Sequence, residues 1–403
     1  MDYACRCPEF VVDVLVGIAR ERGIHQPRIT FESGSSQGDG FIGVVTRVVI
    51  VDENSGAEIR LICKHLKQNP NDTNTSFTTM DMFKREIFIY QRVLPEIVRL
   101  QHEKGVQENE GFFSFPTCHF AGYCEDSSEA ALIFEDLKFE GFKMLEKRKI
   151  PDTKHVMMLF KQLGRLHAAS LALREHKPDI MLQFQFLDDV LTKFMQRQDM
   201  ESLQEQNCRL LQTVLVPEEV EASKFFKRWE TTMWADVAER IQGDNAEPYA
   251  VINHGDCWIN NLMFYYPNEE ASPTKITLLD WQMSRYASPV LDIVYFIFTC
   301  TDKPFRDQHL RVCLDLYYNS LVELLEKLGG DATKQFPLNV FEEHLKKFGK
   351  MGMAMCTFTT PLDTGYVLDY NEEPERRYKN NKDAYDARMR GNVTDFIEYG
   401  YMN

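Results

Sequence analysis

Hydrophobic and polar residues alternate in the first part of the chain in the way that β-strands require. Between Ile29 and Lys67, the segments ITF, VVTRVVIVD and IRLICKHL are separated by two turn-forming stretches, ESGSSQGDGFIG and ENSGAE. This pattern predicts an antiparallel meander. Two further strands are predicted by FPTCHFAGYCED and EAALIFEDL. Between them and the meander, MFKREIFIYQRVLPEI has apolar residues at helical spacing, with Pro95 expected to stop or kink the helix.

After Leu137 the pattern changes to that of long helices. TKHVMMLFKQLGRLHAASLALRE and ASKFFKRWETTMWADVAERI each carry an apolar stripe, which predicts core packing. In the first of these, His167 is expected to be a buried, hydrogen-bonded core residue rather than a catalyst. The stripe of the second comprises Phe226, Trp229, Met233, Val237 and Ile241. One β-rich island, from about residue 250 to 281, interrupts the helices. We therefore expect an α+β fold with two lobes, residues 1–137 and 138–403.

Composition narrows the class of protein. The 403 residues are 44% hydrophobic and 27% charged, enough for a sizeable core and too many for one compact domain by default. The ten cysteines are scattered without metal-binding spacing, which is typical of reduced thiols in an intracellular protein. The net charge is −15 and no basic stripe occurs, so nucleic acid is not an expected partner.

The sequence shows no targeting or membrane-spanning pattern. The first residues, MDYACRCPEFVVDVLVGIAR, lack a basic start and resemble an amphipathic helix rather than a signal peptide. The run IVYFIFTC is far too short to span a bilayer. We therefore expect a cytoplasmic protein with no membrane span. The sequence does not indicate an oligomeric state.

The β-rich island contains a dense polar cluster, HGDCWINN, at residues 254–261. The strands NLMFYY and KITLLDW flank the turn-forming segment PNEEASPT and predict a β-hairpin. Asn261 and Asp280 are placed symmetrically about the turn, so antiparallel pairing is expected to bring them to the same end of the hairpin, next to Asp256. Two carboxylates and an amide oxygen suit Mg²⁺ holding a polyphosphate, and a carboxylate not bound to the metal can accept a proton from a hydroxyl.

The N-terminal region supplies matching parts. A glycine-rich turn containing Gly38 and Gly40 can let backbone N–H groups approach phosphates. Lys64 on the third strand and Glu86 on the following helix occur in the order in which kinases pair a phosphate-holding lysine with a glutamate. Taken singly, each has an ordinary alternative: a plain turn, a solvated charge at a strand edge and a charge on a helix surface. Their order along the chain favours the kinase interpretation.

These stretches resemble the kinase-like phosphotransferases of small molecules, which include aminoglycoside phosphotransferases and choline kinases, and most closely the arthropod ecdysteroid kinase-like family. The resemblance rests on GDGF, LICK, EIFIYQRVLPE, IFEDL, LGRLHAAS, HGDCWINN, LLDWQ and SPVLDIVYF. It implies ATP and Mg²⁺ as cofactors, Asp256 as catalytic base, and Asn261 and Asp280 as metal ligands. The nucleotide-binding residues that it implies are Lys64, Glu86, Gly38, Asp39, Gly40 and the backbone of Glu135, Asp136 and Leu137. His254 and Asp292 are expected to support the catalytic loop, and Trp258 is expected to be a further structural support of the site.

The acceptor is expected to be a small molecule with a hydroxyl group. DWQ stands where protein kinases have D-F-G, no A-P-E follows, and Trp258 occupies the place of the catalytic-loop lysine. The resemblance points to an ecdysteroid or a xenobiotic alcohol. A catalytically silent kinase-like binding protein remains an alternative. A serine esterase with Ser36 in the G-x-S-x-G match GSSQG is disfavoured, because a strand rather than a helix is predicted to follow it.

Overall fold

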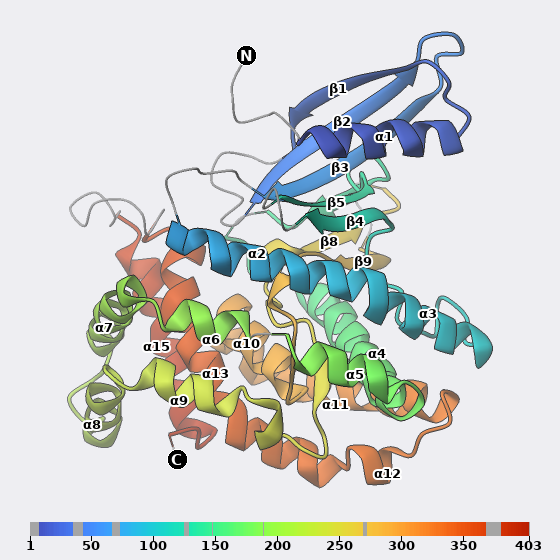
Figure 1. Ribbon diagram of the computed structural model, residues 1–403. Coiled ribbons are helices and arrows are strands. Elements are labelled where there is room, and N and C mark those ends of the chain that lie inside the picture. Colours follow the sequence, from blue (N-terminus) through green and yellow to red (C-terminus); the bar gives the residue numbers. More distant parts are fainter. Residues whose placement is uncertain are drawn as a thin grey trace.

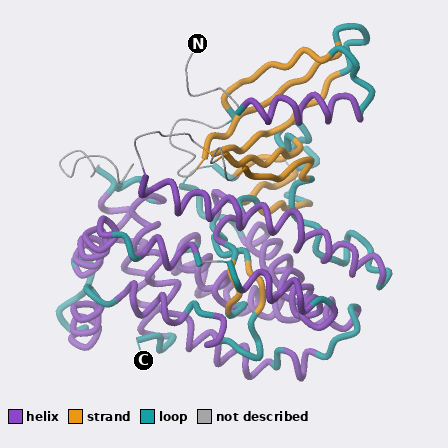
Figure 2. The backbone as a smooth tube through the Cα atoms, viewed as in Figure 1, coloured by secondary structure: helices purple, strands orange, loops and turns teal. Residues whose placement is uncertain are grey.

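The computed structural model describes residues 8–34, 43–66, 73–124, 129–146, 148–187, 189–268, 272–367 and 380–402. It has a β-rich N-terminal part and a larger helical C-terminal part (Figures 1 and 2). The predicted α+β class is confirmed. The elements of the N-terminal part are α1 (Glu9–Glu21), β1 (Pro27–Ser33), β2 (Gly43–Asp52), β3 (Glu58–Leu66), α2 (Thr73–Phe88), a π-helical turn (Ile89–Val93), α3 (Leu94–Glu103), β4 (Cys118–Cys124) and β5 (Glu129–Glu135).

The N-terminal strands form one five-stranded antiparallel sheet in the order β1-β2-β3-β5-β4. The predicted meander and the two later strands are therefore confirmed. Helix α1 covers one face, where Leu15 packs with Ile50 and Ile133 in a separate small core. Helix α2 lies toward the helical part, and its Phe83 and Ile87 belong to the main core. The sheet is thus held between α1 and α2 (Figure 1).

Pro95 does not end the helix that contains it. A π-helical turn at Ile89–Val93 precedes it, and α3 then runs on to Glu103 with the proline in its first turn. Proline has no N–H and fits best at the start of a helix, and the wider π turn accommodates the break in the α-helical hydrogen-bond pattern.

The larger part is built mainly of helices and contains a small hairpin sheet. Its helices are α4 (Thr153–His176), α5 (Pro178–Gln185), α6 (Val190–Met195), α7 (Gln198–Gln212), α8 (Val220–Trp229), α9 (Met233–Arg240), α10 (Val290–Cys300), α11 (Lys303–Lys327), α12 (Ala332–Gln335), α13 (Leu338–Asp363) and α15 (Lys382–Glu398). Its strands are β6 (Phe142–Met144), β7 (Val251–Asn253), β8 (Leu262–Tyr265), β9 (Lys275–Leu278) and β10 (Arg285–Ala287). Within the described residues, no helix is long and apolar enough to cross a membrane.

The segment predicted as one helix over residues 222–241 is two helices. Helix α8 ends at Trp229, and α9 begins at Met233 after a short turn that contains Thr231 and Thr232. Consecutive β-branched residues lose side-chain freedom in a helix, which makes this the weakest point of the predicted helix. The predicted stripe is nevertheless buried on both sides of the turn, from Phe226 to Ile241, so the prediction of core packing is confirmed.

The predicted β-hairpin is present, but its register differs from the prediction by one residue. β8 and β9 pair antiparallel with Leu262 opposite Leu278, and the Leu279 N–H donates to the carbonyl of Asn261 at 2.8 Å. Asn261 therefore lies opposite Leu279, and Asp280 comes one residue later, beyond the paired strands. The midpoint of the turn-forming segment PNEEASPT, at residues 270 and 271, lies outside the described residues.

Candidate functional site

Lys64 lies at the centre of the charged cluster between the two parts of the chain. Its Nζ is 2.6 Å from Glu86 Oε2 and 2.8 Å from Asp280 Oδ1, so strand β3, helix α2 and the end of the hairpin meet at one ammonium group. Burial alone would lower the pKa of Lys64, but the charges of Asp280 and Glu86 outweigh it and raise that pKa. The lysine therefore stays charged, and the alternative of a solvated charge at a strand edge is wrong.

Glu86 joins the helix to the segment that follows the hairpin. Its carboxylate is almost fully buried; Oε2 accepts from Lys64, and Oε1 accepts from the backbone N–H of Trp281 at 3.3 Å. Burial raises the pKa of Glu86, and the charge of Lys64 acts in the opposite direction. Glu86 is therefore a buried bridge and not a charge on the helix surface.

Asp280 has an unusual backbone conformation. Its φ is +65°, in the left-handed region that few residues other than glycine adopt, although aspartate tolerates it better than most. This turn ends the β9 strand and starts a short 3₁₀ helix at Trp281–Met283. Gln282 in that helix accepts a hydrogen bond from Lys64 at 3.3 Å and donates to Asp280 Oδ2 at 3.2 Å. The turn thus directs the carboxylate toward Lys64, and Gln282 holds both groups.

Asp256 is half-buried in the loop after β7. Its Oδ1 accepts from the Tyr295 hydroxyl at 2.9 Å, and its Oδ2 accepts from Asn261 Nδ2 at 2.8 Å. Burial, together with the charge of Asp280, raises the pKa of Asp256 to about 6, although both hydrogen bonds act against that rise. The structure therefore brings together the predicted Asp256, Asn261 and Asp280, with Tyr295 as an additional contact.

The loop that carries Asp256 is fixed by a buried carboxylate. The Asp292 side chain of α10 accepts the backbone N–H groups of His254 and Gly255, both at 2.8 Å. It also contacts His167 Nε2 at 3.2 Å. Burial would raise the pKa of Asp292, but its contacts with His167 and His254 and the Gly255 N–H hold that pKa below the usual value. His167 is fully buried and also bonds Tyr317, as expected for a core histidine.

His254 connects the loop to the hairpin. Its Nδ1 accepts from the Asp256 N–H at 3.3 Å, and its Nε2 lies 2.9 Å from the carbonyl of Leu279. This pattern requires a neutral ring with the proton on Nε2, and burial lowers the pKa of His254 accordingly. Gly255 has a φ of +84°, and a Cβ there would lie 2.0 Å from the carbonyl oxygen of Met283, so only glycine fits.

Trp258 lies two residues after the predicted base. Its backbone N–H donates to the carbonyl of Asp256 at 3.1 Å, and its carbonyl accepts from the Asn261 N–H at 3.0 Å. These two bonds form the tight turn between base and amide. The indole Nε1 is buried and has no hydrogen-bond partner among the described residues.

The segment predicted to contact adenine connects β5 to the larger part. The carbonyl of Asp136 accepts from the N–H groups of Phe139 and Glu140, and its side chain pairs with Arg47 at 2.7 Å. The Glu135 side chain accepts from the Thr117 N–H at 2.7 Å. The Leu137 N–H donates to none of the described residues. Gly38, Asp39, Gly40 and Ser36 lie outside the described residues.

Sequence reasoning missed three contacts of the site. Gln282 directly follows the DW pair, and Tyr295 lies three residues after Asp292 on the same face of α10, so a helical projection of the apolar run IVYFIF would have marked it. Arg85 gave no such signal; it is buried and donates to the carbonyl of Ser284 at 2.8 Å, which ties α2 to the segment after the hairpin.

A divalent cation suits the donors of this site. The Oδ1 of Asn261 accepts no hydrogen bond from the described residues, and Asp280 Oδ2 accepts only the long bond from Gln282. The charge of Asp280 also raises the pKa of Asp256, which is a repulsion that a cation would relieve. No group of three or more His, Cys, Asp or Glu residues with metal-binding geometry occurs in the described ranges. A site of two carboxylates and one amide is not such a group, and it matches Mg²⁺ with open positions.

A strand lysine paired with a helix glutamate, facing a loop aspartate with its asparagine and a second aspartate, defines the kinase-like phosphotransferases. Residues 37–330 match the model of the ecdysteroid kinase-like family. The chain belongs to this family. No curated protein matches the chain in sequence.

Solved structures of two kinds are similar to the chain. One is choline kinase from Cryptosporidium parvum Iowa II, with 11% identity over 97% of both chains and a TM-score of 0.48. Another is the GDP complex of wild-type aminoglycoside 2'-phosphotransferase-IIIa, with 13% identity over 85% of this chain and 98% of that chain and a TM-score of 0.38. Likeness at this level supports no statement about activity or substrate.

Proposed function

We propose that the chain is an ATP- and Mg²⁺-dependent phosphotransferase that transfers the γ-phosphate to a hydroxyl of a small molecule. The observation that carries the proposal is the pair of short contacts from Lys64 Nζ to Glu86 and Asp280. Kinases need this lysine to be held by the helix glutamate, close to the metal-binding aspartate. Three segments distant in sequence supply the three groups.

Nucleotide binding is assigned to the region between the two parts of the chain. The Leu137 N–H, which donates to none of the described residues, would donate to adenine, and Lys64 would contact the phosphates. The lobe boundary between residues 137 and 138 belongs to the same proposal, because this segment would be the hinge. Asn261 and Asp280 would hold Mg²⁺, which neutralises phosphate charge when bound.

Asp256 is proposed as the base. Its carboxylate accepts the proton of the acceptor hydroxyl while the acceptor oxygen bonds to the γ-phosphorus and the bond to the ADP oxygen breaks. A pKa of about 6 leaves the group mostly ionised at neutral pH and still basic enough to take a proton. Tyr295 and Asn261 occupy one oxygen each and fix the orientation of the carboxylate.

The acceptor is proposed to be an ecdysteroid or a xenobiotic alcohol in the cytoplasm. Trp258 supports a small acceptor, because it replaces the catalytic-loop lysine of protein kinases by a large apolar ring. Family membership supports phosphotransfer over the esterase alternative with Ser36. A catalytically silent kinase-like binding protein would instead bind the nucleotide without turnover.

ADP release from purified protein with Mg·ATP and a panel of ecdysteroids, choline and phenolic glycosides tests the proposal. We expect one acceptor class to stimulate ADP release and Asp256→Asn to abolish it with unchanged nucleotide affinity. Nucleotide binding without turnover on any acceptor would favour the silent kinase. Labelling of Ser36 by a fluorophosphonate, with ATP-independent ester cleavage, would favour the esterase.

A further inference from the structure

A second candidate site lies on the far side of α13. A pocket of about 500 Å³ is bordered by α8, α9, α13 and the last residues of the chain, which lie close together in Figure 1. Its apolar surface comes from Phe225, Trp229 and Met402. The Phe225 and Trp229 rings are in contact, with centroids 5.3 Å apart. The pocket volume is in the range of small-molecule sites.

A lysine whose side chain is largely buried lines this pocket. Lys350 of α13 is only 8% exposed, and its Nζ lies 5.4 Å from the centre of the Phe225 ring. It forms no hydrogen bond or ion pair with the described residues. Burial lowers the pKa of Lys350 and the nearby Arg240 lowers it further, while the charge of Asp236 acts in the opposite direction. The Nζ is not among the fully buried polar atoms that lack a partner, so it keeps some exposure and can be reached from the pocket.

The carboxylates around the pocket do not neutralise Lys350. Asp236 is already paired: Oδ1 accepts from Arg240 Nε at 2.9 Å, and Oδ2 accepts from Trp229 Nε1 at 3.2 Å. Glu239 is exposed and lies more than 4.0 Å from the lysine nitrogen. Arg228 adds another positive charge at the rim. The pocket therefore presents an unpaired cation next to two aromatic rings.

This pocket is separate from the catalytic region. Gly352 packs directly on α10, since a Cβ there would lie 2.5 Å from the carbonyl oxygen of Val294. Lys350 is two residues earlier, about 200° around the helix, and so points away from α10 and its Tyr295. α13 thus lies between the pocket and the proposed base.

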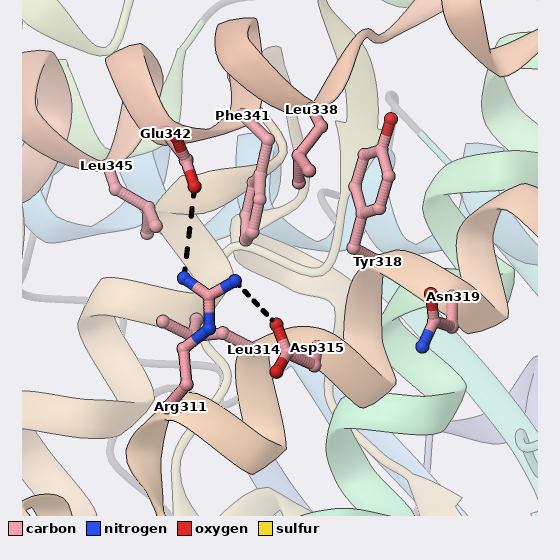
Figure 3. A pocket seen from close by; sticks show the side chains of 9 residues that line it. All are labelled: Arg311, Leu314, Asp315, Tyr318, Asn319, Leu338, Phe341, Glu342 and Leu345. Carbon is pink, nitrogen blue, oxygen red and sulfur yellow. Dashed lines mark ion pairs between the residues drawn. The ribbon is translucent and has the colours of Figure 1, made fainter.

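The pocket between α11 and α13, shown in Figure 3, is a useful contrast. Its volume is about 210 Å³. Its arginine forms ion pairs, since Arg311 lies 2.9 Å from Asp315 and 3.8 Å from Glu342. None of the predicted site residues lines it. Because its charges are satisfied internally, nothing in it calls for an ionic ligand.

We propose that the Lys350 pocket binds a small aromatic carboxylate, with the carboxylate paired to Lys350 and the ring against Phe225 and Trp229. The described residues supply both the positive charge and the apolar walls of the pocket. The proposal does not depend on phosphotransfer.

Calorimetry on the full 403-residue chain tests the proposal that the Lys350 pocket binds an aromatic carboxylate. The probe is naphthalene-2-carboxylate, and naphthalene-2-methanol is its uncharged counterpart. We expect the carboxylate to bind at least about 10-fold more tightly than the alcohol, since a hydrogen bond between two charged groups is among the stronger polar contacts. Equal affinity of the two probes, or no binding of either, would overturn the proposal. This comparison needs no variant.

Variants locate the site. Lys350→Met, which keeps the apolar stem, is expected to lose at least about 10-fold in carboxylate affinity, and Lys350→Arg to stay within about 3-fold. Lys346→Met, on the exposed face of the same helix, removes the same charge and is the matched control. Asp280→Ala must bind the probe as the wild type does. Unchanged binding in Lys350→Met, or loss in Lys346→Met or Asp280→Ala, would place the probe elsewhere and refute the assignment.

Discussion

Replacing the proposed base by its neutral isostere is expected to stabilise the protein while removing its activity. The fold raises the pKa of Asp256 from 3.8 to about 6, which corresponds to about 3 kcal/mol of unfavourable interaction with the ionised carboxylate at neutral pH. Asp256→Asn removes this charge. It also loses one acceptor, for Tyr295 or Asn261, at a cost of about 1 kcal/mol. We therefore expect the metal-free variant to be more stable by about 2 kcal/mol at pH 7.

The pH dependence provides an internal control for this prediction. Between pH 4 and 6 the unfolded chain ionises Asp256 while the folded chain keeps it protonated, so wild-type stability from this group falls as pH rises through that window. Above pH 6 this loss of wild-type stability is complete, and below pH 4 it is absent. The advantage of Asp256→Asn should accordingly disappear near pH 4.

Urea unfolding of both proteins in EDTA, at pH 4.5 and pH 7, measures the difference. Asp244→Asn is the matched control, because Asp244 is exposed in the short 3₁₀ helix before β7 and the substitution removes the same charge. Its stability should match that of the wild type at both pH values. If Asp256→Asn were less stable than the wild type at pH 7, the carboxylate would be stabilised by its surroundings and the electrostatic account of the site would be refuted.

Two further changes test the neighbours of Asp256. Asp280→Ala is expected to weaken Mg·ATP binding at least 10-fold, because it removes a metal ligand and a partner of Lys64; unaltered affinity in calorimetry would contradict the metal role. Tyr295→Phe removes a hydrogen bond that lowers the pKa of Asp256, so the acid limb of kcat/KM should move to higher pH by about one unit. A pH profile that coincides with the wild type would mean that Tyr295 does not act on the base.

The order of strands and helices could be predicted because it depends on local periodicity. The meander, the two later strands and the buried stripe from Phe226 to Ile241 all follow from apolar spacing. The break at Thr231 and Thr232 and the π turn before Pro95 do not follow from apolar spacing, because that spacing continues across both. The hairpin register was one residue off because the turn length alone does not show where pairing ends.

The candidate site was predictable where sequence motifs carry it and not where distant segments meet. HGDCWINN and LDWQ indicate Asp256, Asn261 and Asp280. The left-handed turn at Asp280 brings that side chain to Lys64, and periodicity gives no sign of it. Tyr295 was missed because it lies in an apolar run, although its spacing from Asp292 places both on the same face of α10, where the Tyr295 hydroxyl reaches Asp256.

The central claim is phosphate transfer to a small-molecule hydroxyl by a site that contains Asp256, and mass spectrometry of the acceptor after incubation with Mg·ATP tests it most directly. We predict an acceptor that gains one phosphate group, with wild-type protein and with Asp244→Asn but not with Asp256→Asn. An acceptor phosphorylated equally by Asp256→Asn, or ADP formed with no phosphorylated alcohol, would contradict the account.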